Sequence, residues 1–519
     1  MKKLYILFLL SASISSASFA QPEYKDVAGI FYQRCTSCHH DNGGAPFSMM
    51  NYSETSPWAA SIQADLNSGK MPPWPPDTTY SRFLHERIIT QTEKNDILSW
   101  ISGGAVKGDT TLAPTAPTYF THKLHGTPDL IVKVPGFASN ATTSDVYNCF
   151  SIPTSLTTDR ILRAFEIVPN NPALVHHTVV NVDTVGSVTS NLGGGCFSEP
   201  GDFSIGGYAP GTPPVVFSGQ APLKIGIKIK AGSNVVMQQH YPAGSGGIID
   251  STEIRMYFYP IGTTGVRPIF VNTFLTNWLM SIPANQVKTY TAKYPTNSST
   301  LPVDISIYAS SPHAHKVNVS MLVYAYRASP VDTIPLIRIP KWDFDWQGMY
   351  VHKNMIKVPA GYKLGSKHVY DNTTNNPNNP NNPPVPVNAG TSTTDEMLFD
   401  AFQWMPYQAG DELINIGNLL SGDSLLNGVA EMGSPAQIIT SYVYPNPVTG
   451  NATLIVTNEK IANCELKLFD IFGKEISMDV TRKTDAFSIR RGEQPAGIYF
   501  YTLKAGKFSG SGKIILMDK

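Results

Sequence analysis

The chain has 519 residues, with 39 Lys and Arg balanced by 39 Asp and Glu, and a length of this size predicts three or four domains. A zero net charge gives no sign of a nucleic-acid partner or of an anionic membrane surface. Only 15% of the residues are charged, while 41 Gly and 40 Pro are present, and this mixture favours turn-rich β-structure.

The first twenty residues have the pattern of a secretory signal. Lys2 and Lys3 precede the apolar run from Leu4 to Leu10, and small residues lead to a cleavage position after Ala20. No later stretch reaches 18 uninterrupted apolar residues, so no transmembrane segment is expected. The sequence therefore predicts that residues 1–20 are removed and that the mature protein is exported.

Residues 21–115 carry most of the helical signals of the chain. One helix is expected from the Ser56-Pro57 start, followed by Trp58, Ile62 and Leu66 at four-residue spacing. A second is expected where Thr90 and Glu93 form a capping box, with an apolar face of Ile97, Trp100 and Ile101 and a stop at Gly103-Gly104. These patterns predict a small all-α domain, ended by a Pro/Thr-rich linker at 110–117.

Beyond this linker the apolar residues occur in short or alternating runs, which are typical of strands. Examples are Leu130 to Val134, Leu174 to Val182 and Val317 to Tyr326. We expect a mainly β chain with two β-domains, at 118–270 and 271–430, and a small β-sandwich at 441–519. An Asn/Pro-rich stretch at 371–386, taken alone, has the composition of a linker.

Within the helical segment, Cys35-Thr36-Ser37-Cys38-His39 is a c-type haem attachment sequence. Its two thiols are spaced for thioether bonds to the porphyrin, and His39 would ligate the iron. A zinc or redox site is the alternative, although no second Cys pair completes a zinc site. Met71, in a Pro-stiffened loop, is the favoured sixth ligand, with Met49 and Met50 as rivals. Residues 21–110 resemble a monohaem cytochrome c.

With two cysteines assigned to the haem, Cys149 and Cys196 remain as a candidate disulfide in an oxidising compartment. Cys464 lies in an alternating segment, where a buried and inert thiol is expected.

Histidines cluster at three places away from the haem motif: His176-His177, His240, and His313-Ala314-His315. Residues two apart share one face of a strand, so His313 and His315 can present two imidazoles to one metal. Adjacent His176 and His177 would point to opposite faces of a regular strand, and each of these clusters read singly is compatible with a structural role.

Taken together, the clusters resemble the copper type II ascorbate-dependent monooxygenases, a family that includes peptidylglycine α-hydroxylating monooxygenase and dopamine β-hydroxylase. The resemblance covers about 120 to 430 and preserves the order of its segments along the chain. The matching segments are Val175-His176-His177-Thr178, Gln239-His240-Tyr241, Pro312-His313-Ala314-His315, Tyr370-Asp371-Asn372 with the Asn-Pro run, and Thr394-Asp395-Glu396-Met397.

This resemblance implies two tandem, jelly-roll-like β-sandwiches that face each other across a cleft, each with one copper. The first copper would be held by His176, His177 and His240, and the second, where oxygen and substrate meet, by His313, His315 and Met397. A thioether such as Met397 favours Cu(I). The Asn-Pro run would become a loop inside the second sandwich, and Cys149 and Cys196 would match a family disulfide.

The implied activity is hydroxylation of a C–H bond in a small organic or peptide substrate. In peptide-processing members, an Arg before the His pair and an Asn and a Tyr after the Met anchor a substrate carboxylate. Ser311, Phe399 and Ala401 occupy these positions here, which argues against a glycine-extended peptide. The two coppers would be reduced again by ascorbate, by another redox partner or by the haem, with electrons expected to enter at the His176 site.

The last unit resembles the C-terminal sorting domain of type IX secretion substrates, through Tyr444-Pro445-Asn446-Pro447 and Gly497-Ile498-Tyr499-Phe500. This resemblance implies contact with the type IX secretion machinery and release or attachment at the cell surface, with an ordinary adhesive β-sandwich as the alternative. For the whole chain, a non-catalytic copper and haem protein that stores metal or passes electrons competes with the monooxygenase, and an adhesin is a third reading.

Overall fold

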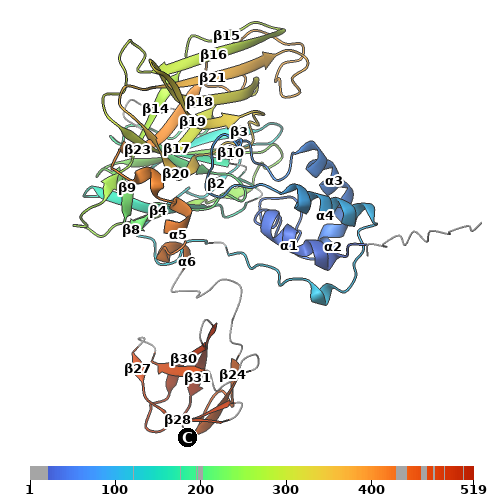
Figure 1. Cartoon of the computed structure of the whole chain (residues 1–519), viewed down its shortest axis with the longest axis vertical. Coiled ribbons are helices and arrows are strands. Elements are labelled where there is room, and N and C mark those ends of the chain that lie inside the picture. The colour runs from blue at the N-terminus through green and yellow to red at the C-terminus, as the bar shows by residue number, and fades with distance from the viewer. Residues whose placement is uncertain are drawn as a thin grey trace, which may run out of the picture. The chain divides into compact units, whose positions relative to one another are not determined.

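The computed structural model describes residues 21–41, 43–120, 122–172, 174–175, 177–194, 196, 203–427, 441–456, 464–470, 474–483, 486–505 and 508–518. The expected signal at 1–20 and the candidate ligand His176 lie outside the described residues. The chain divides into two compact units, one up to Leu426 and one from Asn427. The described residues are mainly in strands, with helices concentrated near the N-terminus (Figure 1).

A helical bundle opens the first unit, and we call residues 21–115 the helical unit. Its elements are α1 (Tyr24–Arg34), α2 (Tyr52–Thr55), η1 (Ser56–Trp58), α3 (Ala59–Ser68), α4 (Gln91–Ser102) and η2 (Thr110–Leu112). They enclose a core of their own in which Val27, Phe31, Ile97 and Trp100 are fully buried. The candidate rival ligand Met49 also packs in this core.

The capping signals in the helical unit were only partly predictive. The Thr90 and Glu93 capping box starts α4 and Gly103 ends it, which confirms that prediction. The expected N-cap at Ser56 is wrong, because the side chain of Asn51 accepts the Glu54 N–H and caps the helical segment five residues earlier. Helix α1 was not predicted, although Glu23 and Asp26 form a capping box at its start.

Two sheets follow the helical unit (Figure 1). The strands of the larger sheet, in order, are β1 (Leu130–Lys133), β12 (Glu253–Phe258), β4 (Arg160–Val168), β9 (Leu223–Ile229) and β13 (Arg267–Pro268), with β7 (Val215–Val216) on β4 and β8 (Gly219–Gln220) on β9. The strands of the smaller sheet are β3 (Val146–Pro153), β10 (Asn234–Tyr241), β5 (His177–Asp183) and β6 (Phe203–Tyr208). A short pair joins β2 (Phe137–Ala138) to β11 (Ile249–Asp250).

A second pair of sheets begins directly after β13, and each of its two sheets has four strands. One consists of β14 (Phe270–Thr276), β23 (Phe399–Pro406), β17 (Ile305–His313) and β20 (Tyr350–Val358). The other consists of β16 (Gln286–Tyr294), β21 (Lys363–Asn372), β18 (Asn318–Ala328) and β19 (Val331–Ile339). A short pair joins β15 (Ser281–Ile282) to β22 (Val387–Asn388), and η3 (Asp411–Leu413), α5 (Ile416–Leu420) and α6 (Ser424–Asn427) follow β23.

One hydrophobic core runs from the first pair of sheets into the second. Phe217 and Tyr308 belong to the same buried cluster, and their ring centroids are 6.0 Å apart. Burying an apolar side chain of this size contributes about 1.5–3 kcal/mol, so the shared core resists separation of the two pairs of sheets.

The Asn/Pro-rich stretch lies between β21 and β22 and is fixed to the second pair of sheets. The buried Asn372 amide donates to the carbonyls of Ile282, Pro283 and Val385. Asn376 and Asn379 each accept the N–H of the residue two positions on, at 3.0 Å. These are Asx turns, in which an Asn side chain replaces a backbone acceptor. The stretch is therefore an ordered loop of asparagine turns.

The C-terminal unit is a small β-sandwich. Its sheets have the strand orders β24 (Ser441–Tyr444), β25 (Asn451–Val456), β29 (Ala486–Arg490), β28 (Asp479–Arg482), and β27 (Glu475–Ile476), β26 (Glu465–Phe469), β30 (Gly497–Ala505), β31 (Phe508–Leu516). Cys464 is buried in its core, as expected. Asn446 accepts the Ile515 N–H at 2.8 Å and donates to the Lys513 carbonyl at 2.9 Å, which fastens the start of the unit to its last strand.

Candidate metal and haem sites

Two histidines meet on neighbouring strands of the first pair of sheets. His177 begins β5 and stands directly opposite His240 of β10 in the antiparallel register. Their Nδ1 atoms are 3.2 Å apart, and the ring of Tyr147 stacks on the His240 ring at 4.5 Å. Two imidazole nitrogens that bind one metal ion at about 2.0–2.1 Å are this far apart when the nitrogen–metal–nitrogen angle is roughly 100°. The same separation suits a hydrogen bond between the two rings.

The second ring nitrogen of His240 faces a carboxylate. His240 Nε2 lies 3.1 Å from Asp145 Oδ2. Burial raises the pKa of Asp145, but the Ala243 N–H and the His240 ring outweigh it and hold that pKa below its ordinary value. A histidine that donates one N–H to a carboxylate keeps the lone pair of the other nitrogen for a metal. The His240 ring is thus oriented with Nδ1 toward His177.

A disulfide joins Cys149 to Cys196, which confirms the predicted pair. Cys149 lies on β3 opposite Gln238 of β10, and the Gln238 side chain accepts the Cys196 N–H at 2.9 Å. The bridge therefore attaches the Cys196 segment to the strand that carries His240.

His313 and His315 lie at and just beyond the end of β17, in the second pair of sheets. Their ring centroids are 5.2 Å apart, with the ring planes at 84°. His313 Nδ1 is 2.5 Å from Gln347 Oε1, and His315 Nδ1 is 3.1 Å from the Asp395 carbonyl. Because both acceptors require an N–H at Nδ1, both Nε2 atoms keep a lone pair.

Burial also keeps these rings neutral. It lowers the pKa of both histidines, and the neighbouring His315 lowers that of His313 further. A neutral imidazole is the form that binds a metal.

Glu396 brings Met397 next to His315. Its carboxylate is fully buried, and Oε2 accepts the His315 N–H at 2.8 Å and the Met397 N–H at 3.1 Å. Oε1 accepts the N–H groups of Val317 and Asn318 at 2.7 and 3.2 Å. Burial raises the pKa of Glu396 to about 7, against the opposing effect of these four bonds. The main chains of two candidate ligands thus converge on one carboxylate oxygen.

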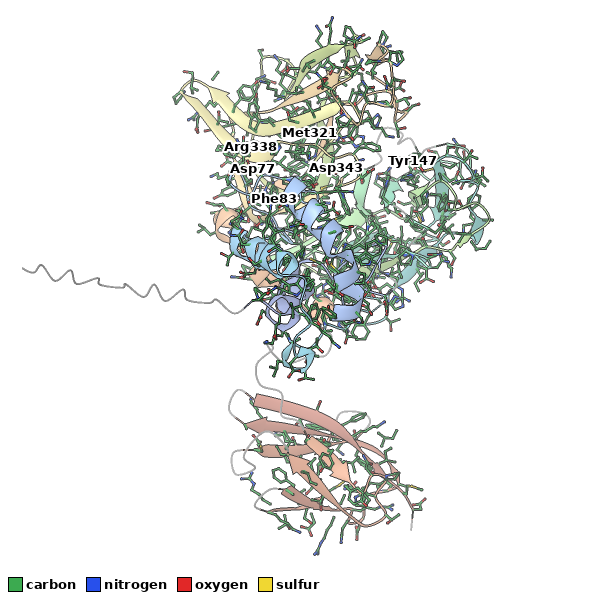
Figure 2. All side chains as sticks on the ribbon, turned by 90° about the vertical axis from the view of Figure 1, so that its right-hand side faces the viewer. Asp77, Phe83, Tyr147, Met321, Arg338 and Asp343 are labelled. Atoms are coloured by element: carbon green, nitrogen blue, oxygen red, sulfur yellow. A yellow bond between two sulfur atoms is a disulfide. The ribbon has the colours of Figure 1, made fainter. Side chains whose placement is uncertain are left out.

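An electrostatic influence connects the surroundings of the two histidine pairs. Burial, then the carboxylates of Asp145 and Asp345, raise the pKa of Tyr147, which stacks on His240. Asp345 belongs to the 343–349 loop, which also carries Gln347, the partner of His313. Figure 2 labels Tyr147 and Asp343, at the start of this loop.

The haem-attachment motif forms the turn that ends α1. The His39 N–H bonds to the Cys35 carbonyl at 3.0 Å, and His39 Nδ1 lies 3.0 Å from the Phe47 carbonyl, which leaves Nε2 for a metal. Burial raises the pKa of the Cys35 thiol to about 12, whereas a redox-active thiol needs a lowered pKa. The residues fit covalent haem attachment better than thiol redox chemistry.

Met71 lies in the loop after α3, half-buried. The Met71 N–H donates to the Asp65 carbonyl at 3.3 Å, and the Asp65 carboxylate raises the pKa of His39. Asp65 thus interacts with both candidate haem ligands. Burial is the larger influence on His39 and lowers its pKa.

The orienting residues Gln347, Asp145 and Tyr147 were not predicted, since each approaches its histidine only through the fold. Glu396 was visible beside Met397 in the sequence, but its role depends on three backbone donors from another segment, those of His315, Val317 and Asn318.

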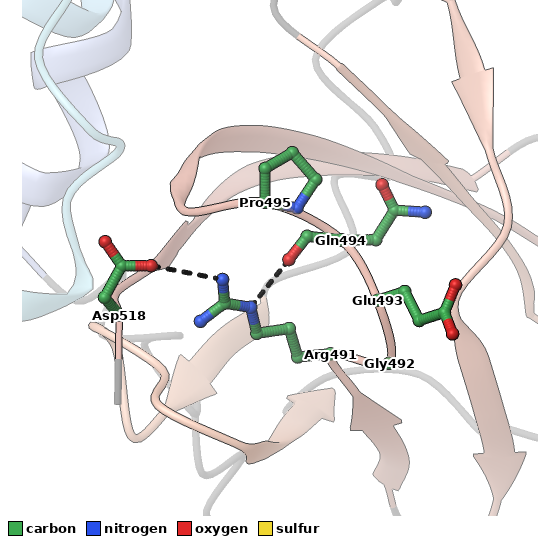
Figure 3. Close-up of a pocket in the computed structure, with 6 residues that line it drawn as sticks. All are labelled: Arg491, Gly492, Glu493, Gln494, Pro495 and Asp518. Atoms are coloured by element: carbon green, nitrogen blue, oxygen red, sulfur yellow. Dashed lines mark hydrogen bonds and ion pairs between the residues drawn. The ribbon is translucent and has the colours of Figure 1, made fainter.

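Among the described residues, no group of three His, Cys, Asp or Glu side chains is placed to hold a metal ion. The first candidate set includes His176, which is not described, and the second includes the thioether of Met397. In the described part of the chain, no helix has the length and apolar character needed to cross a membrane. A shallow pocket of the C-terminal unit is lined by Arg491, Gln494 and Asp518 and carries no candidate ligand (Figure 3).

Residues 442–517 match the family described as the secretion system C-terminal sorting domain. The C-terminal unit is therefore a type IX sorting domain, which directs the chain to the cell surface or the extracellular space. No curated protein matches the chain.

Solved structures give only remote likenesses. The BSP domain of a biofilm-associated protein is 9% identical. The match covers 78% of this chain and 84% of the BSP domain chain, with a TM-score of 0.14. A titin I-band fragment, I67–I69, is 7% identical. The match covers 73% of this chain and 100% of the fragment, with a TM-score of 0.13. At these TM-scores neither structure defines the fold.

Proposed function

We propose that this exported chain is a copper-dependent monooxygenase that hydroxylates a C–H bond of an organic substrate with dioxygen. The observation that carries the proposal is the orientation of the ring nitrogens of His240, His313 and His315. Each of these rings has one nitrogen facing an oxygen acceptor, at 3.1, 2.5 and 3.1 Å. For His313 and His315 this arrangement places the lone pair at Nε2, the nitrogen that would bind a metal.

The donor sets suit copper. In the proposal, His176, His177 and His240 hold one ion, and His313, His315 and Met397 hold the other. Imidazole accommodates both oxidation states, and a thioether favours Cu(I). Copper bound there would supply one-electron redox chemistry and reactivity toward dioxygen.

The surroundings of the second site supply an apolar surface for a substrate. The Phe344 ring lies 5.9 Å from His315, and the Phe399 ring lies 6.4 Å from His313. These rings would exclude water and orient the C–H bond. Ser311 pairs with Ala401 on the adjacent strand, so neither position offers a charged group for a substrate carboxylate.

The haem c is proposed to be held by Cys35 and Cys38, with His39 and Met71 as axial ligands. His39 Nε2 is left for iron by the bond from Nδ1 to the Phe47 carbonyl. Ascorbate, another donor or this haem would return the coppers to the reduced state.

The first test is the ratio of copper to haem iron, by elemental analysis of mature protein that has been loaded with copper and freed of loosely bound metal. We expect a ratio near two. A ratio near zero would contradict both copper sites, and a ratio near one would leave a single site.

The second test is oxygen uptake with ascorbate and a panel of organic substrates. We expect His240→Ala and Met397→Ala to abolish oxygen-coupled product formation while haem uptake stays intact. Replacement of the exposed His122 by Ala is the matched control and should leave product formation unchanged.

A non-catalytic copper and haem protein that passes electrons at the cell surface is the second candidate. The uncharged positions Ser311, Phe399 and Ala401 favour it. Full copper loading without substrate-dependent oxygen uptake across the panel would support it.

A further inference from the structure

A non-helical segment of the helical unit, residues 77–87, is attached to the second pair of sheets. Leu84 N–H donates to the Val351 carbonyl at 2.8 Å, and Lys353 N–H donates to the Arg82 carbonyl at 2.9 Å. Phe83 pairs with His352 of β20 and belongs to the buried core of these sheets. Figure 2 shows Asp77 beside Arg338, with which it forms an ion pair. We call residues 77–87 the clamp segment.

The clamp segment and the loop before it bring aromatic rings to the start of β20. Trp74 follows Met71 by three residues, and its ring lies edge-on to Tyr350, with centroids 5.6 Å apart. The Tyr350 hydroxyl donates to the Trp346 carbonyl at 3.2 Å. The loop that carries the candidate haem ligand Met71 is therefore connected to the backbone of Trp346 through Trp74 and Tyr350.

The other side of the haem motif leads to the same tryptophan. A Cβ built on Gly211 would lie 2.2 Å from Cys38 Sγ and 3.8 Å from Arg87 Nη1, so both side chains lie against one glycine. The Arg87 guanidinium lies over the Trp346 ring, 5.6 Å from its centroid, within the range of a cation–π contact. Trp346 thus contacts the helical unit through Arg87 and is linked to Trp74 through Tyr350.

Trp346 is followed in the chain by Gln347, whose Oε1 is 2.5 Å from His313 Nδ1. Two paths thus lead from the helical unit to the His313 ring. One runs from Arg87 to the Trp346 indole, and the other from Trp74 through the Tyr350 ring and its hydrogen bond to the Trp346 carbonyl. Both continue through the peptide unit between Trp346 and Gln347 and the Gln347–His313 hydrogen bond. Electron transfer through a protein is faster along packed and bonded paths than across open gaps. An indole ring is a favourable intermediate site on such a path.

We infer that, if the proposed function holds, electrons from the haem enter at the His313, His315 and Met397 site through Trp346. With haem and copper bound, one electron would pass from Fe(II) to Cu(II), giving Fe(III) and Cu(I), with no proton transferred and no bond to carbon changed. The inference reverses the expectation that the His176 site receives electrons first.

A competing path leads to the other site. The pKa of Tyr208 is raised by burial and by the nearby Cys38, and Tyr208 pairs with Thr178, the neighbour of His177. Electron entry through Tyr208 is the outcome that would overturn the inference.

The test uses the full mature protein with its haem reduced and its copper oxidised, mixed without oxygen. Haem oxidation is followed by absorbance and copper reduction by electron paramagnetic resonance. In His240→Ala we expect the fast haem oxidation to persist, and in His313→Ala we expect its loss. The opposite result would overturn the inference. Copper and haem contents are measured first, so a protein without copper rejects the proposed function instead.

The path itself is tested by Trp346→Leu, which we expect to slow haem oxidation severalfold while the copper content and the Cu(II) spectrum stay unchanged. The matched control is Trp278→Leu, since Trp278 is half exposed on a remote loop of the same pair of sheets. Tyr208→Leu should leave the rate unchanged. An unchanged rate in Trp346→Leu, or a slowed rate in Tyr208→Leu, would contradict the inference. If Trp346→Leu loses copper, the two histidine variants decide.

Discussion

At the scale of single residues, the Nδ1 atoms of His313 and His315 each face an oxygen acceptor. Gln347 fixes which nitrogen of His313 carries the proton, and the Asp395 carbonyl does the same for His315. Residues that orient a ligand in this way typically change metal affinity by about 10–100-fold when removed. The orienting residues are therefore as open to experiment as the ligands.

We predict that Gln347→Leu weakens copper binding at the second site by about 10–100-fold, because the His313 ring loses the acceptor that holds its Nδ1 proton. Competition with a Cu(I) chelator would measure the change. Gln286→Leu, at an exposed position of β16, is the control and should bind copper as the parent does. Equal affinities in the two variants would contradict an orienting role for Gln347.

Sequence patterns identified residue types well but not their partners. The His-Ala-His spacing was visible in the sequence, although β17 ends at His313 and His315 lies just beyond the strand. Gln347 follows His313 by 34 residues and reaches it only because the 343–349 loop folds back, which no local pattern encodes.

At the scale of elements, strand register decides which side chains meet. His240 stands opposite His177 because β5 and β10 pair in one register, and a slip of one residue would turn one of the rings to the other face. The sequence predicted a strand from Leu174, but β5 begins at His177. Leu174 and Val175 are buried, but they belong to a turn in which the N–H groups of both residues donate to the Asn171 carbonyl. Apolar character alone cannot separate such a turn from a strand.

A buried ion pair links the last strand of the first pair of sheets to the segment after β23. Arg267 donates two bonds to Asp411, at 2.7 and 2.8 Å, and Ser306 donates a third at 2.6 Å. Burial raises the pKa of Asp411, but these bonds outweigh it and hold the pKa below its ordinary value. A lowered pKa means that the charged carboxylate stabilises the fold. This stabilisation is complete above the unfolded-state pKa, about 3.9, and is lost as the pH falls through the lower folded-state pKa.

We predict that Asp411→Asn costs about 1.5–3 kcal/mol at neutral pH, because the partly buried Arg267 loses its charged partner and keeps only the Pro406 carbonyl as an acceptor. The difference in melting temperature from the parent should begin to shrink below about pH 4, where Asp411 of the unfolded chain takes up a proton, and should be lost once the pH has fallen through the lower folded-state pKa. Calorimetry across this pH range would measure both effects. Asp304→Asn, which breaks the more exposed pair with Lys357, is the control and should have little effect. A difference that is constant with pH would contradict the assignment.

At the scale of the whole molecule, the helical unit has its own core but is attached to the second pair of sheets. Its buried core is separate from the cluster that contains Phe83. The composition of the chain predicted the helical and β parts, but not this attachment, because it depends on pairing between residues about 270 positions apart, such as Phe83 and His352.

We predict that Phe83→Ala weakens the attachment by about 3–5 kcal/mol, because it removes a buried ring from the core of the sheets. Limited proteolysis followed by mass spectrometry should show faster cleavage near residues 77–87, while the helical unit keeps its circular dichroism. Phe270→Ala, which alters a partly exposed ring, is the control. Unchanged cleavage in Phe83→Ala would mean that the clamp segment is held by its backbone bonds and the Asp77 ion pair alone.

The sorting domain closes on itself through Asn446, which bonds to the backbone on both sides of Ile514 in the last strand. A chain that stops before these residues leaves the Asn446 side chain without its partners and the sheet without β31. The export signal therefore becomes complete only when synthesis has passed residue 515, after every candidate ligand has been made. The last strand is thus the part of the chain on which closure of the sorting sandwich depends.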